Sequence, residues 1–267
     1  MVEDDKTMSK EVEMLDDANT GESTPVMNKS TVPALANKQQ RGFENENEGD
    51  LLIPRVKLVQ DLSPERKEKI ADTGDLVDSL SKELLNGAVF IPVYKYNNNI
   101  KWKDRADGGG MMCRSMDGRV ASDYVTGETL QCAKCMQCEF DNTKSGKEAE
   151  PLCTKYINFL GFIEGQDYPI VVSFCRTYLS EGKKLFSMAR LSMEDMWNKK
   201  YKLISKKKSK NDNEWFIIMT TPAGKTDEDQ RNFGEILYTM FSGKEIKADI
   251  EDEYTAPSTI DVDSTEF

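Results

Sequence analysis

Apolar and polar positions divide the chain into a patterned middle and two polar ends. The first 48 residues are rich in Glu, Asp, Asn, Lys, Thr and Ser, with only scattered apolar residues. Residues 248–267 are again polar and acidic. Segments of this composition bury too little apolar surface to offset the entropy of ordering. We therefore predict a disordered acidic arm over 1–48, a folded region over 49–247 and a disordered acidic tail over 248–267.

Several segments of the middle have the composition and alternation of β-strands. Ala88–Tyr96 is rich in Val, Ile, Phe and Tyr, Asn97–Asn99 predicts a turn, and Ile100–Lys103 begins the returning strand. Further strands are predicted at 111–114, 156–163 and 168–176, and a hairpin at 201–207 and 215–221. Many strands and few helices predict a mainly β fold of the α+β class, with a small barrel or twisted sheet and helical additions.

The helical signals are few. Ser63-Pro64-Glu65 is a helix start, and Ser180–Leu191 fits a short helix despite Gly182. Ser192–Asp195 resembles a capping box that opens another helix. A last helix should begin near Thr226, because its apolar residues recur at helical spacing and Gly243 stands at the C-cap: Phe233, Ile236, Leu237, Met240 and Phe241.

Five of the six cysteines lie between residues 113 and 153. A C-x2-C turn directs two thiolates toward one point, and four thiolates complete the tetrahedron of a structural zinc ion. The spacing predicts one Zn²⁺, held by an insertion at about 113–153, with four ligands: Cys132, Cys135, Cys138 and Cys153. The chain contains no histidine, so mixed Cys/His sites are excluded.

Other interpretations of these cysteines stay open. Cys113 could replace one of the four ligands. An iron–sulfur cluster is a rival, because ferredoxin motifs begin C-x2-C-x2-C, although the x3-C-P that follows there is missing here. Unliganded thiols are a further alternative, and a disulfide framework is not expected in a cytoplasmic protein. Cys175, in an apolar run, is predicted to be a buried core thiol.

Charge is unevenly distributed along the chain. The net charge is −11, yet residues 1–50 carry 12 acids against 5 bases and residues 249–267 carry 7 acids and no base. The middle is therefore mildly basic, and between Arg176 and Lys210 there are 11 bases against 3 acids. Such a local field attracts polyanions even on a globally acidic protein.

Aromatic and basic residues are interleaved in two β-like segments and a later hairpin. Single-stranded nucleic acids are bound by cations that follow the phosphates and by rings on which bases stack. A ring in a strand is more often part of the core than a platform for bases. The predicted contacts are Tyr94, Tyr96, Lys101, Trp102, Lys103, Arg105, Phe174, Arg176, Tyr178, Lys183, Lys184, Lys206, Lys207 and Lys208.

Catalysis and membrane insertion are not expected. Without histidine, Ser-His-Asp and Cys-His constellations are excluded. No arrangement of Asp and Glu has the spacing that a magnesium-dependent nuclease would require, so we predict a protein that is not an enzyme. No segment approaches the roughly 20 apolar residues of a membrane span, and the N-terminus lacks the features of a signal peptide. We expect a cytoplasmic protein.

The end of the chain resembles that of bacterial and bacteriophage single-stranded DNA-binding proteins. An acidic segment ends in Thr265-Glu266-Phe267, and residues 52–58, 62–65 and 89–93 are similar to a phage-encoded family often found near recombination genes. That family tends to carry a cysteine knuckle before a strand similar to 156–160. The resemblance implies an oligonucleotide-binding (OB-like) barrel with a zinc-stabilised insertion. It also implies a tail that recruits partners through its acids and final ring: Asp261, Asp263, Glu266 and Phe267.

Together these observations predict a phage-type protein that coats and protects single-stranded DNA during replication, recombination or repair. Its acidic tail would compete with DNA for the basic groove and would recruit a polymerase, helicase or recombinase. The alternative is a zinc-ribbon interaction protein or transcription regulator that binds single strands weakly or not at all.

Overall fold

The computed structural model describes residues 51–103, 109–139, 143, 150–210, 213–244 and 246. The arm predicted at 1–48, the tail predicted at 248–267 and Arg105 lie outside the described residues. Within the described ranges the protein is mainly β, with one sheet of eight strands and a second of two. The predicted α+β class is confirmed.

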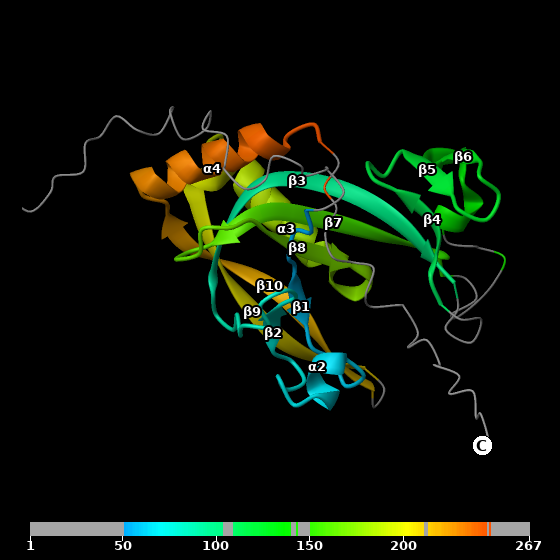
Figure 1. Cartoon of the computed structure of the whole chain (residues 1–267), viewed down its shortest axis with the longest axis horizontal. Coiled ribbons are helices and arrows are strands. Elements are labelled where there is room, and N and C mark those ends of the chain that lie inside the picture. The colour runs from blue at the N-terminus through cyan, green and yellow to red at the C-terminus, as the bar shows by residue number, and fades with distance from the viewer. Residues whose placement is uncertain are drawn as a thin grey trace, which may run out of the picture. The chain divides into compact units, whose positions relative to one another are not determined.

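Strand β3 (Val89–Trp102) is the central strand of the larger sheet (Figure 1). It pairs antiparallel with β7 (Cys153–Ile163) along nearly its whole length, and β7 pairs with β8 (Ile170–Cys175). The start of β3 pairs with β9 (Lys199–Lys210), and its end pairs with β4 (Met111–Ser115). The other strands are β10 (Asn213–Lys225), which pairs with β9, and β5 (Val120–Asp123) and β6 (Thr129–Gln131), which follow β4.

The turn predicted at Asn97–Asn99 is wrong, because β3 continues through these residues. Asn98 and Asn99 are both buried, and Asn158 Nδ2 on the neighbouring β7 donates a 2.7 Å hydrogen bond to Asn98 Oδ1. A cross-strand partner thus satisfies a side chain that would otherwise favour a turn. That partner is 60 residues away, so no local pattern announces it.

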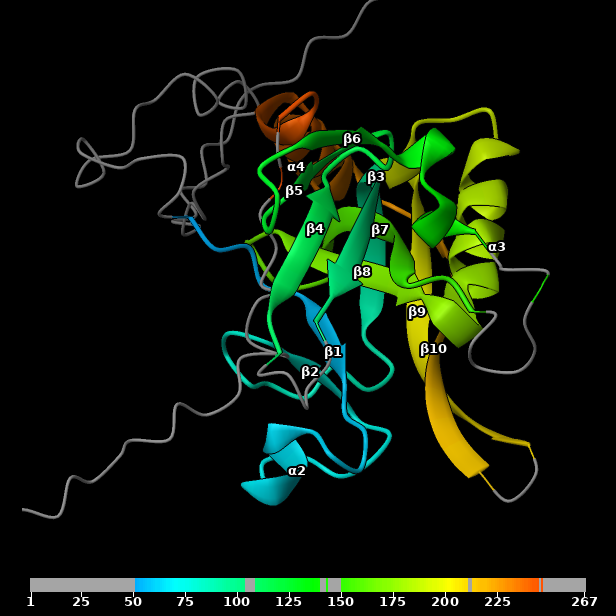
Figure 2. The same cartoon turned by 90° about the vertical axis from the view of Figure 1, so that its right-hand side faces the viewer.

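The two faces of β3 and β7 carry separate apolar cores. The first core joins the sheet to α3 (Leu179–Arg190) through Phe159, Phe174, Leu185, Leu203 and Ile218. The second joins the opposite face to α4 (Glu228–Phe241) through Ile100, Leu160, Val171, Leu237 and Phe241. Figure 1 shows α4 on one side of β3 and the β9–β10 hairpin on the other, and Figure 2 shows α3 beside that hairpin.

The two longer helices are confirmed. Gly182 is accepted inside α3 because a Cβ there would lie 2.8 Å from Phe174 Cβ, so glycine allows the helix to approach β8. Helix α4 begins at a capping box in which Asp227 Oδ1 accepts from Gln230 N at 2.8 Å and Gln230 Oε1 accepts from Asp227 N at 3.1 Å. Met240, predicted on its core side, is half exposed.

The signal at Ser63-Pro64-Glu65 is confirmed as the short helix α2 (Pro64–Lys67). The helix predicted to open at Ser192–Asp195 is wrong. Met193 has a left-handed backbone with φ of 57°, and only a single 3₁₀ turn, η6 (Met196–Asn198), follows. A helical capping box needs regular helical residues after it, and the left-handed residue prevents them.

The larger sheet does not close into a continuous barrel in the described part of the chain. Two of its edge strands, β8 and β10, are instead linked by the segment that contains β1 (Val56–Leu58). Val171 N on β8 donates to Pro54 O at 2.9 Å, and Gln60 Nε2 donates to Phe216 O on β10 at 3.2 Å. These are isolated bonds rather than a ladder, so the OB-like barrel is not confirmed.

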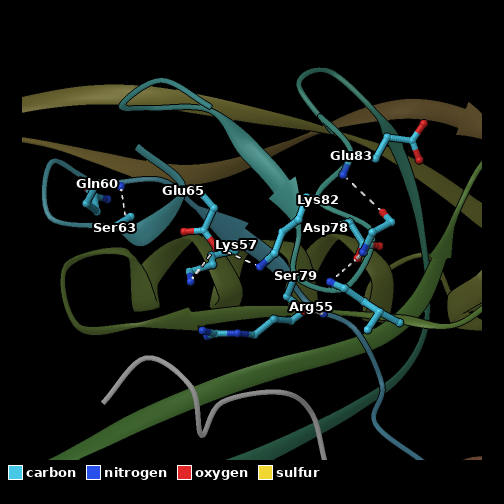
Figure 3. Close-up of polar contacts among 11 residues, drawn as sticks. Arg55, Lys57, Gln60, Ser63, Glu65, Asp78, Ser79, Lys82 and Glu83 are labelled. Atoms are coloured by element: carbon cyan, nitrogen blue, oxygen red, sulfur yellow. Dashed lines mark hydrogen bonds and ion pairs between the residues drawn. The ribbon is translucent and has the colours of Figure 1, made fainter. Parts of the chain in front are cut away.

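A buried ion pair holds the small unit of β1, α2 and β2 (Leu76–Asp78), which Figure 3 shows. Glu65 Oε1 accepts from Lys57 Nζ at 2.9 Å and from Lys82 Nζ at 3.2 Å. The Glu65 and Lys57 side chains are only 2% and 8% exposed. Burial acts to raise the pKa of Glu65, but the two lysines and the backbone outweigh it, and the pKa is lowered overall.

In the described residues, no helix has the length and apolar character that crossing a membrane requires.

Candidate metal centre and nucleic-acid face

Three of the predicted ligands come from two consecutive 3₁₀ turns after β6, η2 (Cys132–Lys134) and η3 (Met136–Cys138). Cys135 N donates to Cys132 O at 3.2 Å, and Cys138 N donates to Cys135 O at 3.0 Å. Each turn therefore brings a cysteine back toward the one three residues earlier. Cys132 and Cys138 are buried and Cys135 is partly buried.

Two more cysteines reach the same place from the sheet. On β3, Lys101 is aligned with Cys113 of β4 on one side and with Cys153 of β7 on the other. Aligned residues of antiparallel strands share a face, so Cys113 and Cys153 lie on the same side of the sheet as Lys101. Both thiols are buried.

These side chains form one group, which we call the thiol cluster: Cys113, Cys132, Cys135, Cys138 and Cys153. They line one small pocket together with Asn99, Ala121, Leu130 and Gln137. Burial raises the pKa of Cys113 to about 11, with the Cys153 thiol adding to the effect. Burial also raises the pKa values of Cys138 and Cys153, and Cys138 hydrogen-bonds with Cys153. Burial thus favours the protonated form of Cys113, Cys138 and Cys153.

The cluster contains all four predicted ligands and also Cys113, which was left as a possible replacement. Among the described residues, no three His, Cys, Asp or Glu side chains stand in the relative positions of a formed metal site. The donor set is nevertheless the one that zinc prefers in structural sites. Cys175 lies apart from the cluster at the end of β8 and is only partly buried, against the expectation of a core thiol.

The opposite side of the same strands carries aromatic and polar side chains, and we call it the aromatic face. Its cross-strand rows begin beside α4 with Tyr94 and Leu160 and continue with Tyr96 and Asn158. The next row is Asn98, Tyr156 and Cys175, and beyond it come Ile100 and Thr154. Trp102 Nε1 donates to Tyr156 OH at 3.4 Å, so two large rings meet near the outer end of this face.

Arg176 closes the outer end of the aromatic face. Its guanidinium approaches Thr154 Oγ1, with both Nε and Nη2 at 3.4 Å. It is exposed, and its backbone is left-handed with φ of 46°, which is uncommon for a residue other than glycine. Left-handed residues of this kind concentrate at functional sites, where the surrounding structure holds them in place. Arg114 of β4, aligned with Ile100, belongs to the same side of the sheet.

The structure divides the predicted aromatic contacts. Tyr96 and Trp102 lie on the aromatic face. Tyr94 is on this face too, but it stacks on Tyr96 at 6.4 Å and meets Tyr238 of α4 edge-on at 6.2 Å, so α4 covers it. Phe174 is fully buried in the first core, which removes it from the predicted binding surface. Tyr178 packs against that same core.

The predicted cations are also divided. Lys101 lies beside the thiol cluster rather than on the aromatic face, and Lys103 is exposed just after β3. Lys183 and Lys184 are exposed on α3, where Lys184 pairs with Glu181 at 2.7 Å.

Lys206, Lys207 and Lys208 are exposed near the tip of the β9–β10 hairpin. Lys207 is paired with Glu214 at 2.6 Å. Lys206 and Lys208 point to the other side of the hairpin, together with Trp215. The hairpin and α3 lysines are therefore separate from the aromatic face and would add charge at a distance.

Sequence reasoning missed several members of the aromatic face, among them Arg114, Tyr156 and Asn158. Tyr156 and Asn158 stand two residues apart on β7, and this spacing was the only sequence signal that they share a face of the sheet. Their alignment with Asn98 and Tyr96 follows only from the register of β3 and β7. Arg114 could not be placed on this face, because the sequence predicted a strand at 111–114 but not the strand with which it pairs.

Comparisons with known proteins give one match. Curated proteins and solved structures yield none. A family model described as Pam3 phage gp34-like protein matches residues 25–247. Since this match covers well over half of the chain, the protein belongs to the Pam3 phage gp34-like family.

Proposed function

We propose that this protein binds single-stranded DNA on the aromatic face and serves phage DNA replication, recombination or repair, without catalysing a reaction. The observation that carries the proposal is the partly exposed Trp102 ring together with the exposed Arg176 at the outer end of one sheet face, where the buried Tyr156 supports Trp102. Rings accept stacked bases of any sequence, and an arginine binds the phosphates between them. The phage family agrees with such a role but does not require it.

The thiol cluster would hold one structural zinc ion in this proposal. Five thiols are available for four coordination positions, and Cys113 stands as well placed as the four cysteines named from their spacing. Zinc would replace the thiol protons, and the resulting negative charge would lie next to Lys101. The ion would fix β4, β5 and β6 against the end of β3, which positions Trp102.

The acidic tail would compete with DNA for the cationic surface and, once displaced, recruit replication or recombination proteins. The tail has seven acids, no base and a terminal Phe267. This part of the proposal rests on the sequence alone, because the tail lies outside the described residues. Deleting residues 249–267 should tighten binding to DNA at low salt and abolish the recruitment of partners.

Fluorescence anisotropy with labelled 30-mers, single-stranded and duplex, tests the main proposal at several salt concentrations. We expect preference for the single strand and a slope of about −0.7 in log K against log [salt] for each phosphate contacted. Arg176→Ala should weaken binding and reduce the slope by about one contact, whereas Arg176→Lys should retain most of the slope. Lys207→Ala is the matched control, since Lys207 is engaged by Glu214 away from the face.

A protein that does not bind single strands at low salt, with or without its tail, would refute this function. The second candidate, an interaction or transcription-regulating protein, would then be favoured. Its supporting observation is that the segment around the thiol cluster exposes large apolar side chains: Val120, Tyr124, Val125, Met136 and Leu152. Exposed apolar groups of this number are typical of surfaces that bind other proteins.

A further inference from the structure

One row of the aromatic face has an unusual feature: three aligned polar side chains each hold a buried atom without a hydrogen-bond partner. Tyr96 on β3 is aligned with Asn158 on β7, and Asn158 is aligned with Ser173 on β8. The unpartnered atoms are Tyr96 OH, Asn158 Oδ1 and Ser173 Oγ. Asn158 is fully buried and Ser173 is 8% exposed.

Such atoms are costly, and three in one row are unexpected in a core. A buried polar atom without a partner loses its hydrogen bonds to water, and no hydrogen bond within the protein replaces them. Asn158 already donates to Asn98 through Nδ2, so its Oδ1 is left as an acceptor with a fixed orientation. The burial of Tyr96 raises its pKa, so its hydroxyl keeps its proton and can donate.

We propose that this row binds the Watson–Crick edge of one nucleobase that carries a ring N–H donor, thymine or guanine. The inference rests on the proposed function and adds base selectivity to it. Neighbouring strands lie about 4.8 Å apart, so three aligned side chains span roughly 10 Å, enough for the edge of a base. The fixed acceptor, Asn158 Oδ1, stands in the middle of the row and requires a donor at the middle of the base edge, which thymine supplies through N3–H and guanine through N1–H. The two hydroxyls can donate or accept.

The surroundings of the row suit a nucleotide. The next row outward contains Tyr156, whose hydroxyl contacts Trp102, and Arg176 stands one row further, on Thr154. A single strand that runs outward along the face would place one base on the polar row, the neighbouring base near the rings and a phosphate near Arg176. Because the row is buried, the protein has to open before a base can reach it, and we expect association slower than the usual rate of about 10⁵–10⁷ M⁻¹s⁻¹.

Two substitutions and two matched controls test the inference. Tyr96→Phe and Ser173→Ala each remove one hydroxyl of the row. Tyr201→Phe and Ser205→Ala remove hydroxyls that are equally buried and unpartnered, but on β9, away from the aromatic face. All four variants should keep or raise the thermal midpoint of the free protein, because an unsatisfied buried group is lost.

The readout is the dissociation constant for labelled oligo-dA, oligo-dC and oligo-dT. Wild type should bind oligo-dT about fivefold to tenfold more tightly than oligo-dA and oligo-dC, the value of one hydrogen bond. Tyr96→Phe and Ser173→Ala should lose about fivefold on oligo-dT, while Tyr201→Phe and Ser205→Ala should match wild type.

The outcomes separate this inference from the proposed function. If wild type binds single strands but the row variants behave as the β9 controls do, the row holds water and the inference is overturned while the function stands. If wild type binds no oligonucleotide at low salt, the proposed function fails and the inference fails with it.

Discussion

Replacing Glu65 by Gln tests how much the buried ion pair of the β1–α2–β2 unit stabilises the fold (Figure 3). Gln preserves the shape of the side chain and removes its charge. Lys57 would then keep an ammonium group 8% exposed beside a neutral amide. Removing one partner of a buried pair costs about 3–5 kcal/mol, because the remaining charge stays desolvated without compensation. Lys82, 43% exposed, recovers its hydration easily, so we place the loss near the lower limit, about 3 kcal/mol.

Urea unfolding followed by tryptophan fluorescence measures this loss, with an unchanged m-value as the sign that the unfolding reaction is the same. Lys82→Gln is the matched control and should cost less than about 1 kcal/mol, since it removes only the exposed partner. The double variant Lys57→Met/Glu65→Leu should regain most of the stability, because two apolar side chains need no pairing. If Glu65→Gln costs no more than Lys82→Gln, the reasoning about burial is refuted.

Three further outcomes follow from the same structure. Acidification should destabilise the protein as the pH falls below 4.5, the ordinary pKa of Glu65. The pKa of Glu65 is lowered in the folded protein, so its stabilising contribution is complete above pH 4.5 and is lost as the folded carboxylate takes up its proton. Thermal melts of Glu65→Gln should lack this part of the loss. Gly161→Ala should lower the free energy of unfolding in urea by about 1–3 kcal/mol, because a Cβ at this position would collide with the Ile91 carbonyl oxygen and the Phe90 ring. Gly165→Ala is the comparison: it has no neighbour within 4 Å but a left-handed φ of 87°, and it should cost about 1 kcal/mol. If the thiol cluster holds zinc, removal of the ion by a chelator should lower the thermal midpoint, and reloading should release protons at neutral pH, because burial raises the pKa values of Cys113, Cys138 and Cys153 and keeps these thiols protonated when free. A protein purified without metal and indifferent to added Zn²⁺ or Co²⁺ would contradict the site.

The part of the fold that sequence predicts well is the part governed by local patterns. Helix α4 carries its own capping box and apolar stripe, and the β9–β10 hairpin pairs two strands that are neighbours in the sequence. The asparagine run on β3 misled for the opposite reason, because its partner Asn158 lies on another strand. The short β1–β2 pair also escaped prediction, since three-residue strands are too short to show a period.

Cysteine spacing predicted the position of the thiol cluster but not its full membership. The x2 spacings describe the 3₁₀ turns, which are local, and they name Cys132, Cys135 and Cys138 directly. Cys113 and Cys153 meet them only because both flank Lys101 in the sheet. The interpretation of Lys101 changes as a result. It was predicted to contact nucleic acid, but the pairing of β3 with β4 and β7 places it next to the thiols.

The alternation of β3 connects the two candidate sites. Lys101 faces the thiol cluster and its neighbours Ile100 and Trp102 face the other way, so a shift of this strand end moves both sides at once. The register is irregular between Lys101 and Trp102, and such bulges re-aim the side chains beside them. An ion bound between Cys113 and Cys153 would fix the strands on either side of Lys101 and hold the Trp102 ring against Tyr156. A metal that never touches DNA would in this way set the geometry of the surface proposed to bind it.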